Sequence, residues 1–210
     1  MAYTLIKGVY HIVGYSPDGD SIKFRANNNA RWDKIITDHR ETFEEKLAAE
    51  NGVITLRLQG IDALETHYSP PTLRTPKDLA RSNPGALQKP EPGGHKQPSK
   101  FGQLATAEFL RLLGVNNVEW RSFGKNTWIS NAWIQKRGKE VCVDSKHQDN
   151  IPGYIVTDDV EKNGRPIAWV FPGSARERDG STITADRLAD RLEQSANYHL
   201  LQKGLVYPYF

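Results

Sequence analysis

Residues 53–65 read Val-Ile-Thr-Leu-Arg-Leu-Gln-Gly-Ile-Asp-Ala-Leu-Glu, and this stretch decides the fold. Apolar side chains alternate along its first half with the two-residue period of a half-buried strand, at Ile54, Leu56 and Leu58. Because neighbouring side chains of a strand point to opposite faces, Arg57 is directed to the face away from the apolar stripe. The sequence therefore predicts a strand over 53–61 that carries an arginine on its outer face and runs directly into acidic residues.

Further strands are predicted on both sides of this segment, at residues 3–15, 21–26, 118–123, 154–157 and 165–171. Apolar residues at helical spacing predict one helix or two short ones within 30–50, a helix over 101–113, and a final helix over 185–203 capped by Thr184. Short antiparallel strands with an intervening helix are typical of a small Greek-key barrel. We therefore expect an α+β, mainly β, fold: a five-stranded Greek-key OB-fold (oligonucleotide-binding) barrel with packed helices.

Two turn motifs flank the predicted barrel strands and carry polar chemistry. Asp18-Gly19-Asp20-Ser21 forms the first turn, and Asn163-Gly164-Arg165 is a hairpin turn that leads into the last strand. Both can meet the end of the 53–61 strand at one rim of a barrel. Together these segments supply carboxylates for a hard metal ion, an acid that can handle a proton, and two guanidiniums that can bind a phosphate. Hydrolysis of a phosphodiester requires this inventory.

In their order along the chain and in their amino-acid sequence, these motifs resemble the staphylococcal nuclease (thermonuclease) family. The matching text is Asp-Gly-Asp-Ser-Ile-Lys (18–23), Arg-Leu-Gln-Gly-Ile-Asp-Ala-Leu-Glu-Thr (57–66), Asn-Gly-Arg-Pro-Ile-Ala-Trp-Val (163–170) and Gln-Lys-Gly-Leu-Val-Tyr-Pro-Tyr (202–209). Any one segment is weak, whereas four in the family's order with a helix between the second and third are specific. The resemblance implies one nuclease-like domain over 1–210, with family-atypical insertions at 27–52, 67–100 and 124–150.

The resemblance also implies a metal site and a general base. The family's calcium carboxylates fall on Asp20 and Asp62, and its backbone carbonyl ligand falls on Ala63. Calcium is a hard cation that takes oxygen ligands, and this set leaves coordination positions open for water and a phosphate oxygen. The family's glutamate that contacts the attacking water falls on Glu65, which is placed to act as a general base.

The family's phosphate-binding and substrate-binding residues also have counterparts here. Its two phosphate-gripping arginines fall on Arg57 and Arg165, and Tyr207 and Tyr209 are candidates to stack on a base. The resemblance implies a calcium-dependent endonuclease of low sequence specificity that acts on DNA, RNA or both and leaves 3′-phosphate ends.

The sequence departs from the family pattern at three positions. Leu64 stands where the family often has proline, Asn163 where it often has tyrosine, and Ser21 where threonine is common. The changes at Leu64 and Asn163 could lower the rate of cleavage.

Two other functions are alternatives to an active nuclease. The first is a catalytically weak nuclease-like module that binds nucleic acid or a protein partner. The second hypothesis is that the proline-rich stretch at 67–100, which follows Glu65, gates the cleft or recruits a partner.

Composition restricts the other classes of site. The net charge of +3 is compatible with a polyanionic partner. Cys142 is the sole cysteine, which excludes an intrachain disulfide and a thiolate-rich zinc site. No stretch is apolar enough for a membrane span, so we expect no membrane partner, and we expect a monomer. As written, the chain carries no secretion signal and is expected to be cytoplasmic, or secreted if a leader was removed.

The five tryptophans are interpreted as packing residues of the core or insertions rather than base platforms: Trp32, Trp120, Trp128, Trp133 and Trp169.

Overall fold

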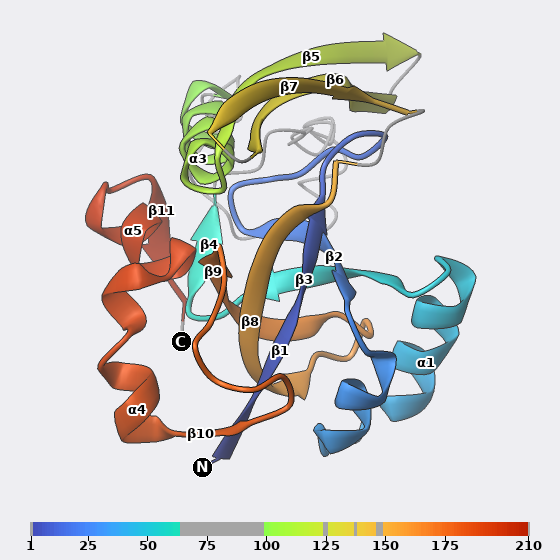
Figure 1. The fold of residues 1–210 in the computed structure, drawn as a ribbon, viewed down its shortest axis with the longest axis vertical. Coiled ribbons are helices and arrows are strands. Elements are labelled where there is room, and N and C mark those ends of the chain that lie inside the picture. Colours follow the sequence, from blue (N-terminus) through green and yellow to red (C-terminus); the bar gives the residue numbers. More distant parts are fainter. Residues whose placement is uncertain (1, 64–98, 124–125, 137, 146–148, 210) are drawn as a thin grey trace, which may run out of the picture.

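The computed structural model describes residues 2–63, 99–123, 126–136, 138–145 and 149–209. Five strands form a closed barrel in the order β1-β2-β3-β9-β8-β1. They are β1 (Ala2–His11), β2 (Ser21–Ala26), β3 (Val53–Leu58), β8 (Ile151–Val160) and β9 (Pro166–Pro172). All neighbouring strands are antiparallel except β3 and β9, which pair in parallel. The predicted five-stranded barrel with packed helices is thus present (Figure 1).

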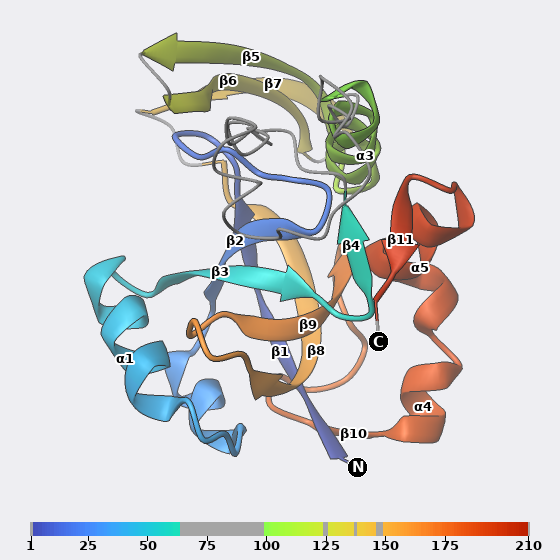
Figure 2. The same cartoon turned by 180° about the vertical axis from the view of Figure 1, so that it is seen from behind.

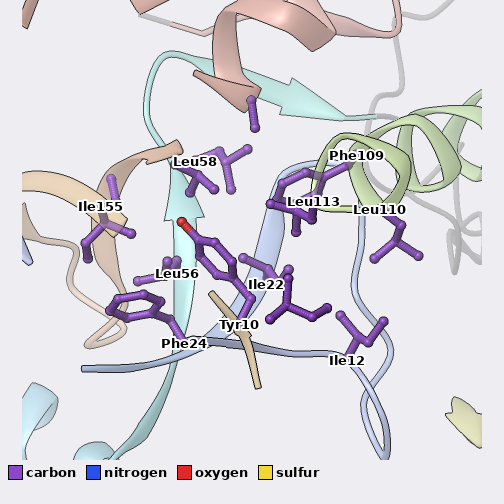
Figure 3. Packing of buried hydrophobic residues seen from close by; sticks show 14 of the residues in the cluster. Tyr10, Ile12, Ile22, Phe24, Leu56, Leu58, Phe109, Leu110, Leu113 and Ile155 are labelled. Atoms are coloured by element: carbon purple, nitrogen blue, oxygen red, sulfur yellow. The ribbon is translucent and has the colours of Figure 1, made fainter. Parts of the chain in front are cut away.

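The barrel closes around an apolar interior to which every strand contributes buried residues, and β2 alternates buried and part-exposed residues along its whole length. In β2 the buried residues are Ile22, Phe24 and Ala26. Helix α3 (Ser99–Leu112) covers one end of this interior, where Phe109 and Leu113 lie between Leu58 and Ile22 (Figure 3). Full burial of a side chain such as Phe109 is worth about 1.5–3 kcal/mol. The predicted 101–113 helix is confirmed, and its apolar face joins the helix to the barrel.

The 27–52 segment forms two short helices, as one of the two sequence alternatives predicted. They are the 3₁₀ helix η1 (Asn29–Lys34), capped by Asn28, and α1 (Arg40–Ala49). Trp32 is buried here, with its ring centroid 6.3 Å from that of Phe24 and 5.3 Å from that of Phe43. This pair of helices lies on the opposite side of the barrel from the C-terminal helices (Figure 1).

A separate three-stranded sheet lies beyond one end of the barrel, beside α3 (Figures 1 and 2). Its strands are β5 (Val115–Phe123), β6 (Asn126–Lys136) and β7 (Lys139–Asp144), in the order β5-β6-β7. Strands β6 and β7 form a hairpin within the 124–150 segment, which is one of the predicted insertions. The connection between β1 and β2 is tied to this sheet, because Gly14 N donates to Ile129 O at 2.8 Å and Ile129 N donates to Tyr15 O at 2.9 Å.

The C-terminal region differs from its prediction. Thr184 caps a helix, as expected, but α4 (Ala185–Ala189) ends after one turn and is followed by η2 (Leu192–Gln194) and α5 (Ala196–Gln202). A single helix over 185–203 is therefore wrong. Ser195 is the physical reason, because its backbone is extended and its side chain accepts a hydrogen bond from Tyr198 N, which starts a new helix.

The strand predicted over 53–61 is also interrupted. β3 ends at Leu58, Gly60 turns the chain with a φ of +71°, and β4 (Ile61–Ala63) begins in a new direction. A φ in this region favours glycine because it lacks a Cβ. β4 pairs with β11 (Val206–Pro208), and β10 (Thr182–Thr184) extends the barrel sheet beside β1. None of the described helices is long and apolar enough to cross a membrane.

Candidate active site

The acidic turn between β1 and β2 is held in a fixed conformation. Asp18 and Ser21 exchange backbone hydrogen bonds, with Asp18 N donating at 3.2 Å and Ser21 N donating at 3.3 Å. The carbonyl of Asp20 accepts from Leu58 N at 2.9 Å, which ties the turn to the end of β3. The turn therefore places the Asp20 side chain beside the strand that carries Arg57.

Gly19 allows this turn to approach helix α3 and strand β4 closely. A Cβ at this position would lie 2.6 Å from the Cβ of Ala105 and 2.9 Å from the Cβ of Ala63, both closer than real Cβ contacts allow. Any larger residue would push the acidic turn away from both elements. The Asp-Gly-Asp motif thus combines two acids with a glycine that close packing requires.

Asp20 is a buried carboxylate with several polar neighbours. It is 6% exposed, and its Oδ2 accepts hydrogen bonds from Arg57 Nη1 at 2.7 Å and from Ala63 N at 2.8 Å. Burial raises the pKa of Asp20 to about 6. The Ala63 N–H and the Arg57 guanidinium oppose this shift, whereas Asp18 and Asp62 add to it. The carboxylate form of Asp20 therefore needs positive charge beyond what Arg57 supplies.

Arg57 connects the two predicted metal carboxylates. It projects from the outer face of β3, opposite Ser21 of β2, as the alternation of the strand predicted. Nη1 donates to Asp20, and Nη2 donates to Oδ1 of Asp62. Burial lowers the pKa of Arg57, but the hydrogen bonds and charges of Asp62 and Asp20 outweigh it and raise the pKa overall. The fork of one guanidinium thus brings the two acids together.

The backbone of Ala63 faces Asp20 rather than β11. In the β4–β11 ladder, Tyr209 N donates to Gly60 O at 3.0 Å, so the pairs that exchange hydrogen bonds are Gly60 with Tyr209 and Asp62 with Tyr207. Ala63 therefore belongs to a non-hydrogen-bonded pair, and its N–H and C=O point to the edge away from β11. Its N–H reaches Asp20 at that edge, so its carbonyl is also directed toward the acidic site.

Arg165 lies on the same outer face of the sheet as Arg57. The parallel register places Arg57 beside Ile167, and Arg165 lies two residues before Ile167 on the same side of the chain. Its Nε donates to Glu161 Oε1 across the hairpin turn. Burial raises the pKa of Glu161, but Arg165 and the more distant Arg57 outweigh it, so the pKa is lowered overall. The influence of Arg57 on Glu161 shows that the two arginines share one electrostatic environment.

Glu161 contacts Arg165 in the candidate site and was not predicted from the sequence. The sequence contains a signal for this contact, because Glu161 and Arg165 carry opposite charges and flank the Asn163-Gly164 turn. A tight turn brings the residues on its two sides together. The described contacts use only Nε of Arg165, so its two terminal nitrogens are available for an anion.

The two C-terminal tyrosines lie at the same site. Tyr207 faces Asp62 across the β4–β11 pair, and the guanidinium of Arg57 lies 6.0 Å from the ring centroid of Tyr209. Tyr207 is 58% exposed and Tyr209 is 63% exposed. The structure thus places seven of the eight predicted site residues on neighbouring elements of one region.

The eighth predicted residue, Glu65, lies outside the described residues, as does Leu64. The predicted insertion at 67–100 also lies outside them, apart from the first residues of α3. Within the described ranges, no group of three or more His, Cys, Asp or Glu residues has the arrangement of a metal site. The implied ligand set is smaller, because it consists of two carboxylates and a backbone carbonyl.

No family model matches this chain, and neither the curated proteins nor the solved structures include a significant match to it. The functional assignment therefore rests on the residues and their geometry.

Proposed function

We propose that this chain is a calcium-dependent phosphodiester hydrolase, an endonuclease that cleaves DNA, RNA or both with low sequence specificity and leaves 3′-phosphate ends. One observation carries the proposal. Arg57 holds Asp20 and Asp62 together with its two terminal nitrogens, and Arg165 stands on the same outer face, where its contacts with the described residues use Nε alone. A pair of acids beside two guanidiniums suits a cation and a phosphate bound next to each other.

The strand order supports a finer description of the fold as an OB-fold. The barrel runs β1-β2-β3-β9-β8-β1, its β3–β9 pair is parallel, and a helix in the connection that follows the third strand covers one end. Proteins with this fold bind oligonucleotides on one barrel face and its neighbouring loops. The proposed site of this chain likewise consists of turns and strand ends on one side of the barrel.

The residues present fit a calcium ion. Asp20 is a buried carboxylate whose pKa is raised to about 6, so a bound cation would stabilise its charged form. Asp62 is close enough to share the Arg57 guanidinium, and the Ala63 carbonyl is directed to the same edge. All three donors are oxygens, which suits a hard cation. Asp20, Asp62 and the Ala63 carbonyl would hold the ion. When bound, it would polarise the phosphoryl group and offset its charge.

The side chains have separate roles in the proposed reaction. With a cation held by Asp20 and Asp62, the planar fork of Arg57 would be free to bind two oxygens of the scissile phosphate. Arg165 binds the same phosphate with its terminal nitrogens while Glu161 fixes its Nε. Both forks stabilise charge that grows on the phosphate oxygens in the transition state. Glu65 accepts a proton from the attacking water as general base.

Cleavage of a 5′-labelled single-stranded DNA, measured with calcium and with excess chelator, tests this proposal. We expect cleavage by the wild type in calcium only, and its loss in Arg57→Ala and Glu65→Ala. Arg121→Ala and Glu45→Ala are matched controls, because both residues are exposed and lie outside the site. Product ends should accept extension by a polymerase only after phosphatase treatment. A wild type that retains DNA on a gel without cleaving it would contradict hydrolysis and favour the nucleic-acid-binding module.

A further inference from the structure

A pocket of about 610 Å³ lies between helix α3, the three-stranded sheet and the β1–β2 connection. Figure 1 shows that connection, in blue, between the barrel and the sheet. The pocket size falls within the range of small-molecule binding sites. Gln103 and Thr106 line it from α3, Val118 and Trp120 from β5, and Pro17 from the connection. None of the described residues that line this pocket has a role in the proposed cleavage.

The exposure of Trp120 contradicts its interpretation as a packing residue. Its side chain is 44% exposed, although Trp32 is buried as predicted. Trp120 pairs with Ile129, and the β5–β6 register shifts just before this pair. Val118 and Trp120 lie two residues apart on β5 and so share one face of the sheet, and both line the pocket. The indole is therefore presented to a ligand space.

The pocket wall suits a flat, uncharged and partly polar ligand. None of the described residues that line it is charged. The indole of Trp120 and the side chains of Val118 and Leu110 provide apolar surface, and Gln103 and Thr127 provide an amide and a hydroxyl. A phosphate would need cations, and the described lining residues provide none. A nucleobase has a π-face for stacking on an aromatic ring and polar edges for hydrogen bonds.

The pocket adjoins the acidic turn that carries Asp18 and Asp20. Pro17 lines it and directly precedes Asp18, and Thr106 Oγ1 donates to Asp18 Oδ1 at 3.4 Å. A ligand in the pocket would thus lie on the side of the acidic turn where α3 and β5 meet. We propose that this pocket is a base-binding subsite, in which a base of single-stranded nucleic acid near the scissile phosphate stacks on Trp120. This inference rests on the proposed nuclease function and adds a substrate contact to the same site.

The test measures kcat/KM in calcium for short single-stranded DNAs in which one abasic position is moved along the strand. We expect Trp120→Ala to lower kcat/KM for the intact strand by about 5- to 150-fold, the range for loss of one base–aromatic stack. An abasic site at one particular position should cost the wild type a similar factor and should cost Trp120→Ala nothing further. Trp128→Ala is the matched control, because Trp128 precedes the buried Ile129 and so faces away from the pocket.

Trp120→Phe keeps the experiment informative if the alanine variant does not fold. It retains a smaller ring and should lose less activity, and DNA should quench its tryptophan fluorescence less than that of the wild type. Equal kcat/KM for wild type and Trp120→Ala, or an abasic penalty that persists in Trp120→Ala, would overturn the subsite while the nuclease function stands. If the wild type shows no calcium-dependent cleavage, the proposed function fails, and the subsite fails with it.

Discussion

Arg57 Nη1 lies 2.7 Å from Oδ2 of Asp20 and forms the innermost ion pair of the candidate site. Asp20 is buried, so the guanidinium offsets part of the cost of ionising a carboxylate away from water. The offset is incomplete, because the pKa of Asp20 remains raised to about 6. A site with residual negative charge and a cation that can exchange partners is prepared for both a metal ion and a phosphate.

Asp20 should make the metal-free protein less stable as the pH rises. The pKa of Asp20 is about 6 in the folded chain against 3.8 for a free carboxyl, so folding favours the protonated form. The resulting stabilisation is complete below pH 4 and is lost as the pH rises through 6. A shift of about two units corresponds to about 3 kcal/mol. Thermal unfolding in chelator from pH 4 to 8 should show this loss in the wild type but not in Asp20→Asn.

Calcium provides the control for that experiment. At pH 7.5 a ligand at 100 times its Kd stabilises the folded state by about 2.7 kcal/mol. Calcium should therefore raise the Tm of the wild type and leave that of Asp20→Asn unchanged. Equal calcium shifts in both proteins would remove Asp20 from the metal site.

Arg57→Lys should remove most of the activity even though it retains the positive charge. Lysine is a point charge and cannot engage two oxygens with a planar fork, either between the two acids or on the phosphate. Loss of one such donor from a transition state costs about 100- to 1,000-fold in rate. Single-turnover cleavage with saturating calcium measures the effect. A lysine variant within about threefold of the wild type would show that the charge alone suffices.

Glu161→Gln should lower activity through Arg165, because Glu161 only positions that side chain. The Glu161 pKa is lowered in the folded chain, so its contribution to stability is present near neutral pH and is lost as the pH falls through the folded pKa. Because the pair is part-exposed, we expect a loss of no more than about 1 kcal/mol at pH 7. KM should rise more than kcat falls, and Arg165→Ala should show no further effect of Glu161→Gln. Additive effects of the two substitutions would contradict a positioning role.

Patterns within single segments of the sequence predicted most of the fold and most of the candidate site. Apolar alternation predicted the face on which Arg57 lies, and the Asn163-Gly164 turn predicted the β8–β9 hairpin. These features depend on neighbours in sequence, which periodicity and turn chemistry report directly. Glu65 was predicted from the family resemblance alone and stays a prediction.

Features that depend on distant partners were not predicted. The break at Ser195 ends one helix and starts another, although the apolar spacing runs through it. Trp120 is interpreted as a packing residue because its neighbours in sequence do not indicate the pocket that it lines. Asn197 is a polar residue that is fully buried, and the apolar spacing of the predicted helix does not indicate this. Each case is decided by tertiary packing that one segment does not encode.

Gly19→Ala should distort the site through packing. The new Cβ would lie 2.6 Å from that of Ala105, and overpacking of this kind costs about 1–3 kcal/mol. We expect a lower urea midpoint and weaker calcium binding, because Asp20 follows directly. Adding Ala105→Gly removes the nearest contact and should restore calcium binding, although a helical glycine costs about 1 kcal/mol by itself. If the double variant binds calcium no better than Gly19→Ala, the contact with Ala105 is not the cause.

Asn197→Ala should destabilise the protein and weaken the site together, because this side chain joins the strands that carry the two arginines. Its Oδ1 accepts from Val170 N at 2.9 Å, and its Nδ2 donates to Gln59 O at 2.9 Å. Alanine leaves the buried Val170 N–H and the part-buried Gln59 carbonyl without these bonds, at up to about 1–3 kcal/mol each. Urea unfolding should therefore show a loss of about 2–5 kcal/mol. The exposed Asn27→Ala is the matched control and should stay within about 0.5 kcal/mol of the wild type. A loss for Asn197→Ala as small as that of the control would show that β3 and β9 hold their register without this bridge.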